Sequence, residues 1–332
     1  MLLKFFRGTV PMVIITIGAI FIALWAQLFF TGPAASGNTV YGVPMPMFGV
    51  LENLTGRGTM AADIVAMVIC TALIMMITVL NTSHFFIIER TFIPALVFIL
   101  LIAILPQYQA LNPVLPAAFF AVNAIRRMLD SYRKQGMAYN FFDAGIFMGT
   151  GSLFYANLIW LGTVVIIGCI IIRGINIKET ALALLGLATP YIIMFGLYYA
   201  LGYNPGELLS LIHSNLFAAN PAPAPSKFAI ATLSVVAVAA IFSLVHVLMF
   251  NKARNIKSRK TFSLLIWMFF ITICVYVFVP SASFEIIWIL GIPTCYFIAQ
   301  WFVFSRKRML PEAFFILLLL SAVLAQVIYV LQ

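Results

Sequence analysis

The sequence predicts an all-α protein that crosses a membrane many times as a helical bundle. Hydrophobic residues make up 64% of the 332 positions and charged residues only 8%, whereas soluble domains carry about 25% charged residues. The apolar residues form long runs, separated by short charged segments and without the alternation of barrel strands. In lipid the backbone must satisfy its own hydrogen bonds, so such runs are helices. We therefore expect residues 1–332 to form a single integral membrane domain with no soluble domain.

The N-terminal segment predicts a retained first helix. Lys4 and Arg7 precede an apolar run that continues to Phe30. A cleavable signal has a shorter apolar core of about 7–15 residues. This run is long enough to span the bilayer instead.

About eleven membrane helices are expected in total. The apolar runs of helical length are 9–30, 61–80, 91–106, 113–131, 141–156, 158–173, 179–201, 228–250, 261–279, 284–304 and 312–331. If the N-terminus is cytoplasmic, every Lys and Arg except Arg57 and Lys227 falls in an inner segment. Basic residues favour cytoplasmic loops, so this pattern predicts a cytoplasmic N-terminus and a C-terminus outside.

The stretch 141–173 predicts a short helical hairpin. As one helix it would be about 50 Å long, far more than a bilayer core of about 30 Å. A single crossing would also place Arg173 and Lys178 outside, against the charge pattern. Asn157 would lie at the tip of the hairpin, which is either two full spans or a re-entrant pair.

Two of the expected outer loops are long. Residues 31–60 carry Glu52 and Arg57 among glycines and prolines. In the loop 202–227, the segment GELLSLIHSNLF repeats apolar residues at helical spacing, which predicts a helix lying at the membrane interface. The Pro-Ala run at 221–225 predicts an extended, stiff segment.

The densest charge in the first half of the chain lies at an expected cytoplasmic elbow within residues 119–157. Arg126 and Arg127 end one apolar helix, and Asp143 lies at the start of the next. In one interpretation, Asn140 and Asp143 cap that helix beside the positive end of its dipole. In the other, Asp143 pairs with Arg126 or Arg127, or the three side chains hold an anionic lipid headgroup.

A stripe of small residues follows on the same helix. Gly145, Gly149 and Ser152 recur at helical spacing. Such stripes allow two membrane helices to approach closely. We expect these residues to serve helix packing, because the glycines lack the Lys-Ser/Thr ending of a phosphate loop.

Candidates for chemistry lie on the expected outer side. The polar groups there are Glu52, Arg57, Asp63, Asn112, Glu207, His213 and Glu285. Multi-span enzymes that use polyprenyl-phosphate sugars often place an acid in the first outer loop, and Glu52 or Asp63 matches that placement. Glu52, Asp63 and His213 are thus candidate catalytic residues, and Arg57 is a candidate for binding an anionic headgroup. In the alternative, His213 is an ordinary interfacial polar residue.

The charge and cysteine patterns limit the other partners. The net charge of +10 resides in short loops between apolar runs, which indicates membrane orientation and contact with anionic phospholipid rather than nucleic acid. The four cysteines show no CxxC spacing and no two histidines share metal-ligand spacing. We expect neither a metal site nor a cofactor.

Several motifs resemble those of a family of bacterial inner-membrane proteins defined by a domain of unknown function. The matching motifs are Arg126-Arg127, Phe142-Asp143-Ala144-Gly145, Ser152-Leu-Phe-Tyr155 and Pro190-Tyr191. The resemblance covers most of the chain and implies the bacterial inner membrane. A looser likeness, in architecture alone, is to transferases and polymerases of polyprenol-linked glycans.

Three functions remain open. The leading hypothesis is a protein of cell-envelope biogenesis that recognises or processes a polyprenyl-phosphate-linked precursor. The second is a non-catalytic accessory subunit of a larger membrane protein complex, favoured by the lack of a catalytic motif. A transporter or channel comes third, because ionisable residues at the middle of the membrane, which ion-coupled transport usually needs, are almost absent from the expected spans.

Overall fold

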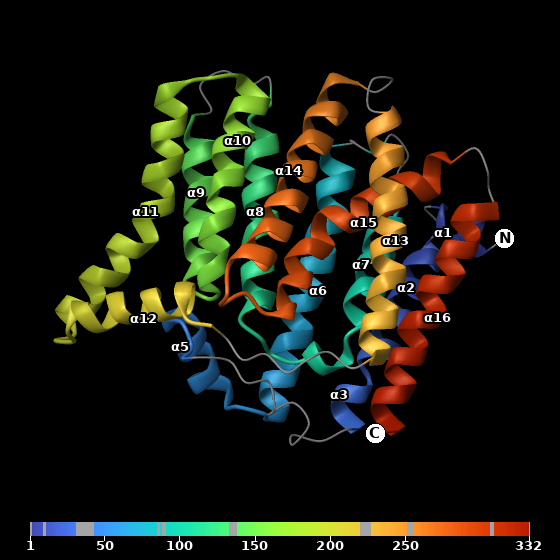
Figure 1. Ribbon diagram of the computed structural model, residues 1–332, viewed down its shortest axis with the longest axis horizontal. Helices are drawn as coiled ribbons and strands as arrows, with labels where there is room; N and C mark the ends of the chain where they lie inside the picture. Colours follow the sequence, from blue (N-terminus) through green and yellow to red (C-terminus); the bar gives the residue numbers. More distant parts are fainter. Residues whose placement is uncertain are drawn as a thin grey trace.

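The computed structural model describes residues 2–8, 11–30, 43–84, 87, 91–132, 138–219, 227–250, 255–305 and 309–331. Within these ranges the protein is helical and has no strand. Most helices run between the same two ends of a single bundle (Figure 1). The predicted all-α fold is confirmed for these residues. The Pro-Ala run at 221–225, for which an extended segment is predicted, lies outside them.

Each expected apolar run overlaps a helix. In chain order the elements are α1 Leu2–Phe6, α2 Pro11–Trp25, α3 Gln27–Phe30, α5 Pro46–Thr55, α6 Met60–His84, α7 Ile93–Ala103, η1 Pro106–Tyr108, α8 Val114–Asp130, α9 Tyr139–Ser152, η2 Ala156–Leu161, α10 Gly162–Arg173, α11 Ile177–Ala200, α12 Pro205–Phe217, α13 Lys227–Phe250, α14 Ile256–Phe278, η4 Phe284–Ile286, α15 Ile287–Phe304 and α16 Met309–Leu331. Among the described residues, seven helical segments are long and apolar enough to cross a membrane. The chain is therefore a multi-pass membrane protein.

The centre of the bundle is built from helices that are apolar on every side. All residues of α7 are buried, and α15 is buried from Trp288 to Val303 except for Leu290. A helix that is hydrophobic all round has no face for water and belongs inside. α6, α15 and α16 pack around α7, so the least polar short helix of the chain lies in the core.

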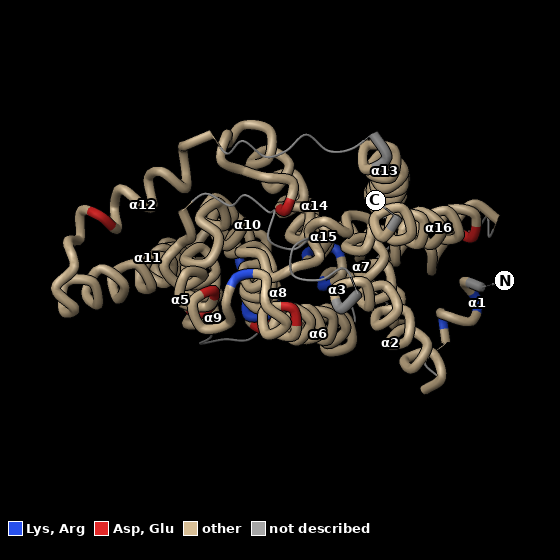
Figure 2. Tube along the Cα trace, turned by 90° about the horizontal axis from the view of Figure 1, so that it is seen from below, with Lys and Arg blue, Asp and Glu red and all other residues tan. Residues whose placement is uncertain are grey.

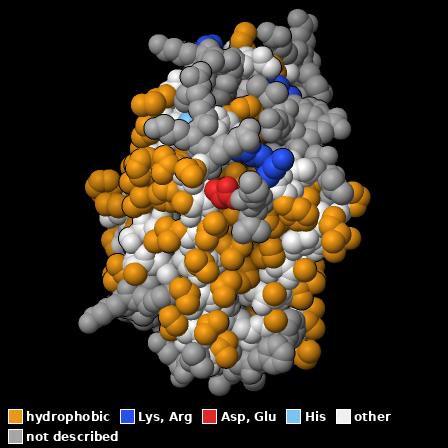
Figure 3. All heavy atoms as spheres, turned by 90° about the vertical axis from the view of Figure 1, so that its right-hand side faces the viewer, with side chains coloured by type: hydrophobic (Ala, Val, Ile, Leu, Met, Phe, Trp, Pro, Cys, Tyr) orange, Lys and Arg blue, Asp and Glu red, His pale blue; other side chains and the backbone are white. Residues whose placement is uncertain are grey.

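The outside of the bundle is apolar as well. On α11, Ile192, Ile193 and Leu197 are all more than half exposed. Figure 3 shows one face on which hydrophobic side chains predominate below a few charged ones. A soluble monomer rarely exposes apolar patches of this extent, so this surface fits contact with lipid chains.

The stretch 141–173 forms two helices. α9 ends at Ser152, and the chain resumes as η2 and α10, which lie beside α9 (Figure 1). One unbroken helix of this length would overshoot a bilayer core of about 30 Å, and the break avoids that mismatch.

Two helices lie across one end of the bundle, which we call the α5 end. α12 runs at a steep angle to α11 and forms in the segment for which an interfacial helix was expected (Figures 1 and 2). Its Leu208 is fully buried with Leu153 and Met194. Asn204 caps the helix by accepting a hydrogen bond from the Gly206 N–H at 2.9 Å. The apolar side of α12 is thus fixed to α9 and α11.

Candidate functional site

α5 positions the candidate site. Pro46 occupies its first turn, and Gly56 ends it with a φ of 78°, a left-handed conformation that glycine tolerates best. The Met47 N–H donates to the Leu153 carbonyl at 3.3 Å, which ties α5 to the end of α9. The Phe48 side chain of α5 is buried and lines two hollows.

The first hollow, the Asp63 hollow, has a volume of about 20 Å³. It is lined by Phe48, Glu52, Gly56, Arg57, Gly58, Ala62, Asp63, Ala110 and Leu111. Arg57 Nε lies 2.6 Å from Glu52 Oε1, and 57% of the Arg57 side chain is exposed. An ion pair this exposed contributes little stability, so the Arg57 guanidinium can exchange Glu52 for an anionic ligand.

Asp63 is the buried acid of this hollow. It lies in the first turn of α6 and is 6% exposed. No Lys or Arg within the described ranges forms an ion pair with it. The positive end of the α6 dipole favours a carboxylate there. Asp63 is thus an acid at a helix N-terminus, and it lines the same hollow as the Arg57–Glu52 ion pair.

The second hollow, the Glu285 hollow, is larger, at about 50 Å³. Its polar lining comes from Tyr155, Asn157, Asn215, Ser281, Ser283 and Glu285. Glu285 lies on η4, directly before α15, and is 4% exposed. The apolar part of the lining includes Phe48 and Phe154. Three segments that are remote in sequence therefore bring hydrogen-bonding groups together around one carboxyl.

Hydrogen bonds join the walls of the Glu285 hollow. Ser281 Oγ lies 2.9 Å from the Leu216 carbonyl oxygen and 3.1 Å from Asn157 Oδ1. Asn157 Nδ2 lies 3.5 Å from the Tyr155 hydroxyl, which is a loose contact. Burial raises the pKa of the Tyr155 phenol, and the nearby Glu285 carboxyl adds to the rise. Tyr155 therefore stays a neutral phenol that can donate and accept hydrogen bonds.

The structure sorts the residues expected on the outer side. Glu52, Arg57 and Asp63 come together in one hollow. His213 does not join them, because its side chain is exposed on α12, its ring packs 5.1 Å from that of Phe217, and it lines neither hollow. Glu285 was grouped with the outer polar residues but was not singled out. The sequence feature that could have identified Glu285 is its position as a single acid directly before an apolar run.

At the opposite end of the bundle, the elbow residues form local contacts. Arg127 Nε lies 3.7 Å from Asp143 Oδ2, and both side chains are partly exposed. Arg126 Nη1 lies 3.9 Å from the sulfur of Met76 instead. Among the described residues, Asp143 therefore pairs with one of the two arginines and holds α8 against the start of α9.

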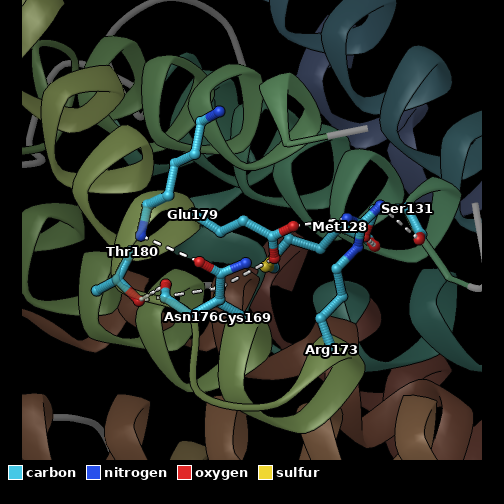
Figure 4. A network of polar contacts seen from close by, with 8 residues as sticks. Met128, Ser131, Cys169, Arg173, Asn176, Glu179 and Thr180 are labelled. Atoms are coloured by element: carbon cyan, nitrogen blue, oxygen red, sulfur yellow. Dashed lines mark hydrogen bonds and ion pairs between the residues drawn. The ribbon is translucent and has the colours of Figure 1, made fainter. Parts of the chain in front are cut away.

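A second ion pair at this end was not expected from the sequence. Arg173 Nη1 lies 2.5 Å from Glu179 Oε1 across the turn between α10 and α11 (Figure 4). Arg173 also donates to the Ser131 carbonyl at 3.3 Å, and Glu179 Oε2 lies 3.8 Å from Cys169 Sγ. The sequence feature that could have indicated this pair is the six-residue spacing of Arg173 and Glu179 across a short turn. This network joins three helices and has a structural rather than a catalytic arrangement.

The small-residue stripe of α9 faces α11. A Cβ added to Gly145 would collide with the Ala183 carbonyl, and one on Gly149 would lie 2.5 Å from the Leu187 carbonyl oxygen. Ser152 Oγ lies 2.7 Å from the Tyr191 hydroxyl. Two of the motifs that prompted the family resemblance, around Gly145 and around Tyr191, thus meet in one helix contact.

Comparison with known proteins identifies a family for this chain, but that family has no known activity. No curated protein matches it, and no solved structure does. Residues 39–331 match a family of unknown function. These residues include α5, α12 and every residue that lines the two hollows. The chain belongs to the family of unknown function DUF6427.

Proposed function

We propose that this protein recognises a polyprenyl-phosphate-linked precursor in the bacterial inner membrane and processes it during cell-envelope biogenesis. The observation that carries the proposal is the Asp63 hollow, where a buried acid lies beside a mainly exposed Arg57–Glu52 pair. α5 and α12 lie across this end of the bundle. A lipid-linked substrate brings its phosphate to this level while its chain stays in the bilayer.

Each residue of the hollow has a role that matches its chemistry. Arg57 binds the phosphate of the substrate, since a guanidinium forms paired hydrogen bonds with phosphate oxygens. Asp63 accepts the proton of an acceptor hydroxyl. The hydroxyl oxygen then bonds to the sugar carbon, the bond from that carbon to the phosphate oxygen breaks, and polyprenyl phosphate leaves with the electron pair. Glu52 holds Arg57 when no substrate is bound.

The charge pattern supports an outer location for this chemistry. The turn that joins α10 to α11 lies at the opposite end, where Arg126, Arg127, Arg173 and Lys178 are found. Cytoplasmic loops are enriched in Lys and Arg. The α5 end therefore faces outward, with anionic phospholipid bound around the basic end.

Native mass spectrometry of the gently extracted protein tests the proposal. We expect the wild-type protein to retain a polyprenyl-phosphate lipid, and Arg57→Gln to lose it. Asp63→Asn should retain the lipid but should not transfer its headgroup to an acceptor. Glu207→Gln is the matched control, because Glu207 is an exposed acid on α12 that lines neither hollow.

Two other results would overturn the proposal. A stoichiometric protein partner with bulk phospholipid alone would make the chain an accessory subunit of a larger membrane complex. Flux of a solute through reconstituted vesicles, without any bound polyprenyl lipid, would favour a transporter or channel.

A further inference from the structure

The Glu285 hollow is a polar site that the proposed chemistry at Asp63 does not use. Its lining contains a carboxyl, two amides and three hydroxyl groups, but neither Lys nor Arg. A phosphate would find no cation there. Phe48 lines both this hollow and the Asp63 hollow, so the two hollows share one wall.

The hydrogen-bonding groups of the hollow suit a ligand that both donates and accepts. A carboxyl group offers acceptor oxygens, and hydroxyl and amide groups both donate and accept hydrogen bonds. Glu285 is buried, and none of the described residues is hydrogen-bonded to its carboxyl or pairs with it as a cation. Buried polar groups usually have partners, and the Glu285 carboxyl, which lines the hollow, is available to a ligand there.

The size and the lining of the hollow further limit which ligands could bind there. At about 50 Å³ the hollow has room for several groups of the size of a water molecule. That matches the hydroxyl groups along one edge of a sugar ring. Phe154 and Phe48 supply apolar faces beside these polar groups.

We propose that the Glu285 hollow binds the hydroxyl groups along one edge of a carbohydrate. This inference rests on the proposed function, because it assigns the sugar of the lipid-linked precursor to a defined site. Glu285 accepts hydrogen bonds from the sugar hydroxyls, and the Asn215 amide contributes from α12. The same chemistry would also suit a free carbohydrate, so both sources are included in the test.

Binding to purified protein in detergent tests the site with three probes. The probes are a polyprenyl phosphate carrying one hexose, the same lipid phosphate without a sugar, and free methyl hexosides. We expect the hexose-bearing lipid to bind at least about tenfold more tightly than the bare one, since a tenfold difference corresponds to about two ordinary hydrogen bonds. Glu285→Gln should reduce that difference and leave the affinity for the bare lipid unchanged.

The control variants separate a local effect from misfolding. Glu207→Gln, on the same end of the molecule but outside both hollows, should preserve the tenfold preference. If Glu285→Gln does not fold, Ser283→Ala and Asn215→Ala at the same hollow replace it, and each should reduce the preference.

The outcomes distinguish this inference from the proposed function. Equal binding of both lipids in the wild type and in Glu285→Gln would overturn the sugar site, show a hollow that holds only water, and leave lipid recognition intact. Glu285-dependent binding of methyl hexosides, with no binding of either lipid, would support the sugar site and overturn the lipid-linked function.

Discussion

Glu179, in the first turn of α11, binds Arg173, the last residue of α10, through an ion pair of 2.5 Å in which only 4% of the Glu179 side chain is exposed. The pair closes the turn between the two helices. Because Arg173 also reaches the Ser131 carbonyl, the end of α8 is held in the same network.

Removing one member of this pair should destabilise the protein strongly. Glu179→Gln leaves the Arg173 charge without its carboxylate, and breaking a buried pair costs about 3–5 kcal/mol. The double variant Arg173→Met/Glu179→Leu should lose less than the sum of the single changes. Thermal unfolding in detergent measures all three variants, and strictly additive losses would contradict a coupled pair.

The close contact of α9 and α11 should not tolerate a methyl group. A Cβ on Gly186 would collide with the Phe142 carbonyl, whereas one on Gly196 of the same helix would meet nothing within 4 Å. Overpacking of this kind costs about 1–3 kcal/mol. Gly186→Ala should therefore lower the unfolding temperature in detergent. Gly196→Ala should not lower the unfolding temperature. Equal effects of the two substitutions would show that helix propensity, rather than packing against α9, determines the change in stability.

The attachment of α12 should depend on Ser281. Its hydroxyl lies 2.9 Å from the Leu216 carbonyl oxygen, near the end of α12. Ser281→Ala leaves that carbonyl without this partner, at a cost of about 1 kcal/mol. Hydrogen exchange should then speed up across 205–217 and stay unchanged in α7. Unchanged exchange in α12 would show that Leu208 alone anchors the helix.

The predicted orientation can be measured by cysteine labelling. In a background in which the four native cysteines are replaced by alanine, Glu207→Cys should react with a membrane-impermeant maleimide added outside intact cells. Lys178→Cys should react only after the cells are opened. Both positions follow the charge pattern, and reversed labelling would invert the topology and place both hollows on the cytoplasmic side.

The helices could be predicted from the sequence because the relevant information is local. Apolar runs bounded by charge produced α6, α11 and α14 to within several residues at each end. The grouping of Glu52 with Asp63 also has a local basis, since only a glycine-containing turn separates α5 from α6.

Contacts between distant segments could not be predicted in the same way. Tyr155, directly before η2, and Glu285, on η4, are far apart in sequence, and nothing in either segment specifies the other. The same holds for Gly186, whose need for a glycine comes from the Phe142 carbonyl on another helix. Arg173 was interpreted only as an orientation signal, because its partner is set by the geometry of a turn.

The shortness of α9 has a consequence for the surrounding membrane. Its 14 residues span about 21 Å, roughly 9 Å less than an ordinary hydrocarbon core. α6 has 25 residues and extends beyond α9 at the α5 end (Figure 1). A bilayer relieves such a mismatch by thinning, so the lipid surface descends in a step from α6 towards α9 and α12. Tyr155 and Asn157 lie just beyond this end of α9, so the lipid headgroup proposed above would reach the Glu285 hollow without leaving its own leaflet.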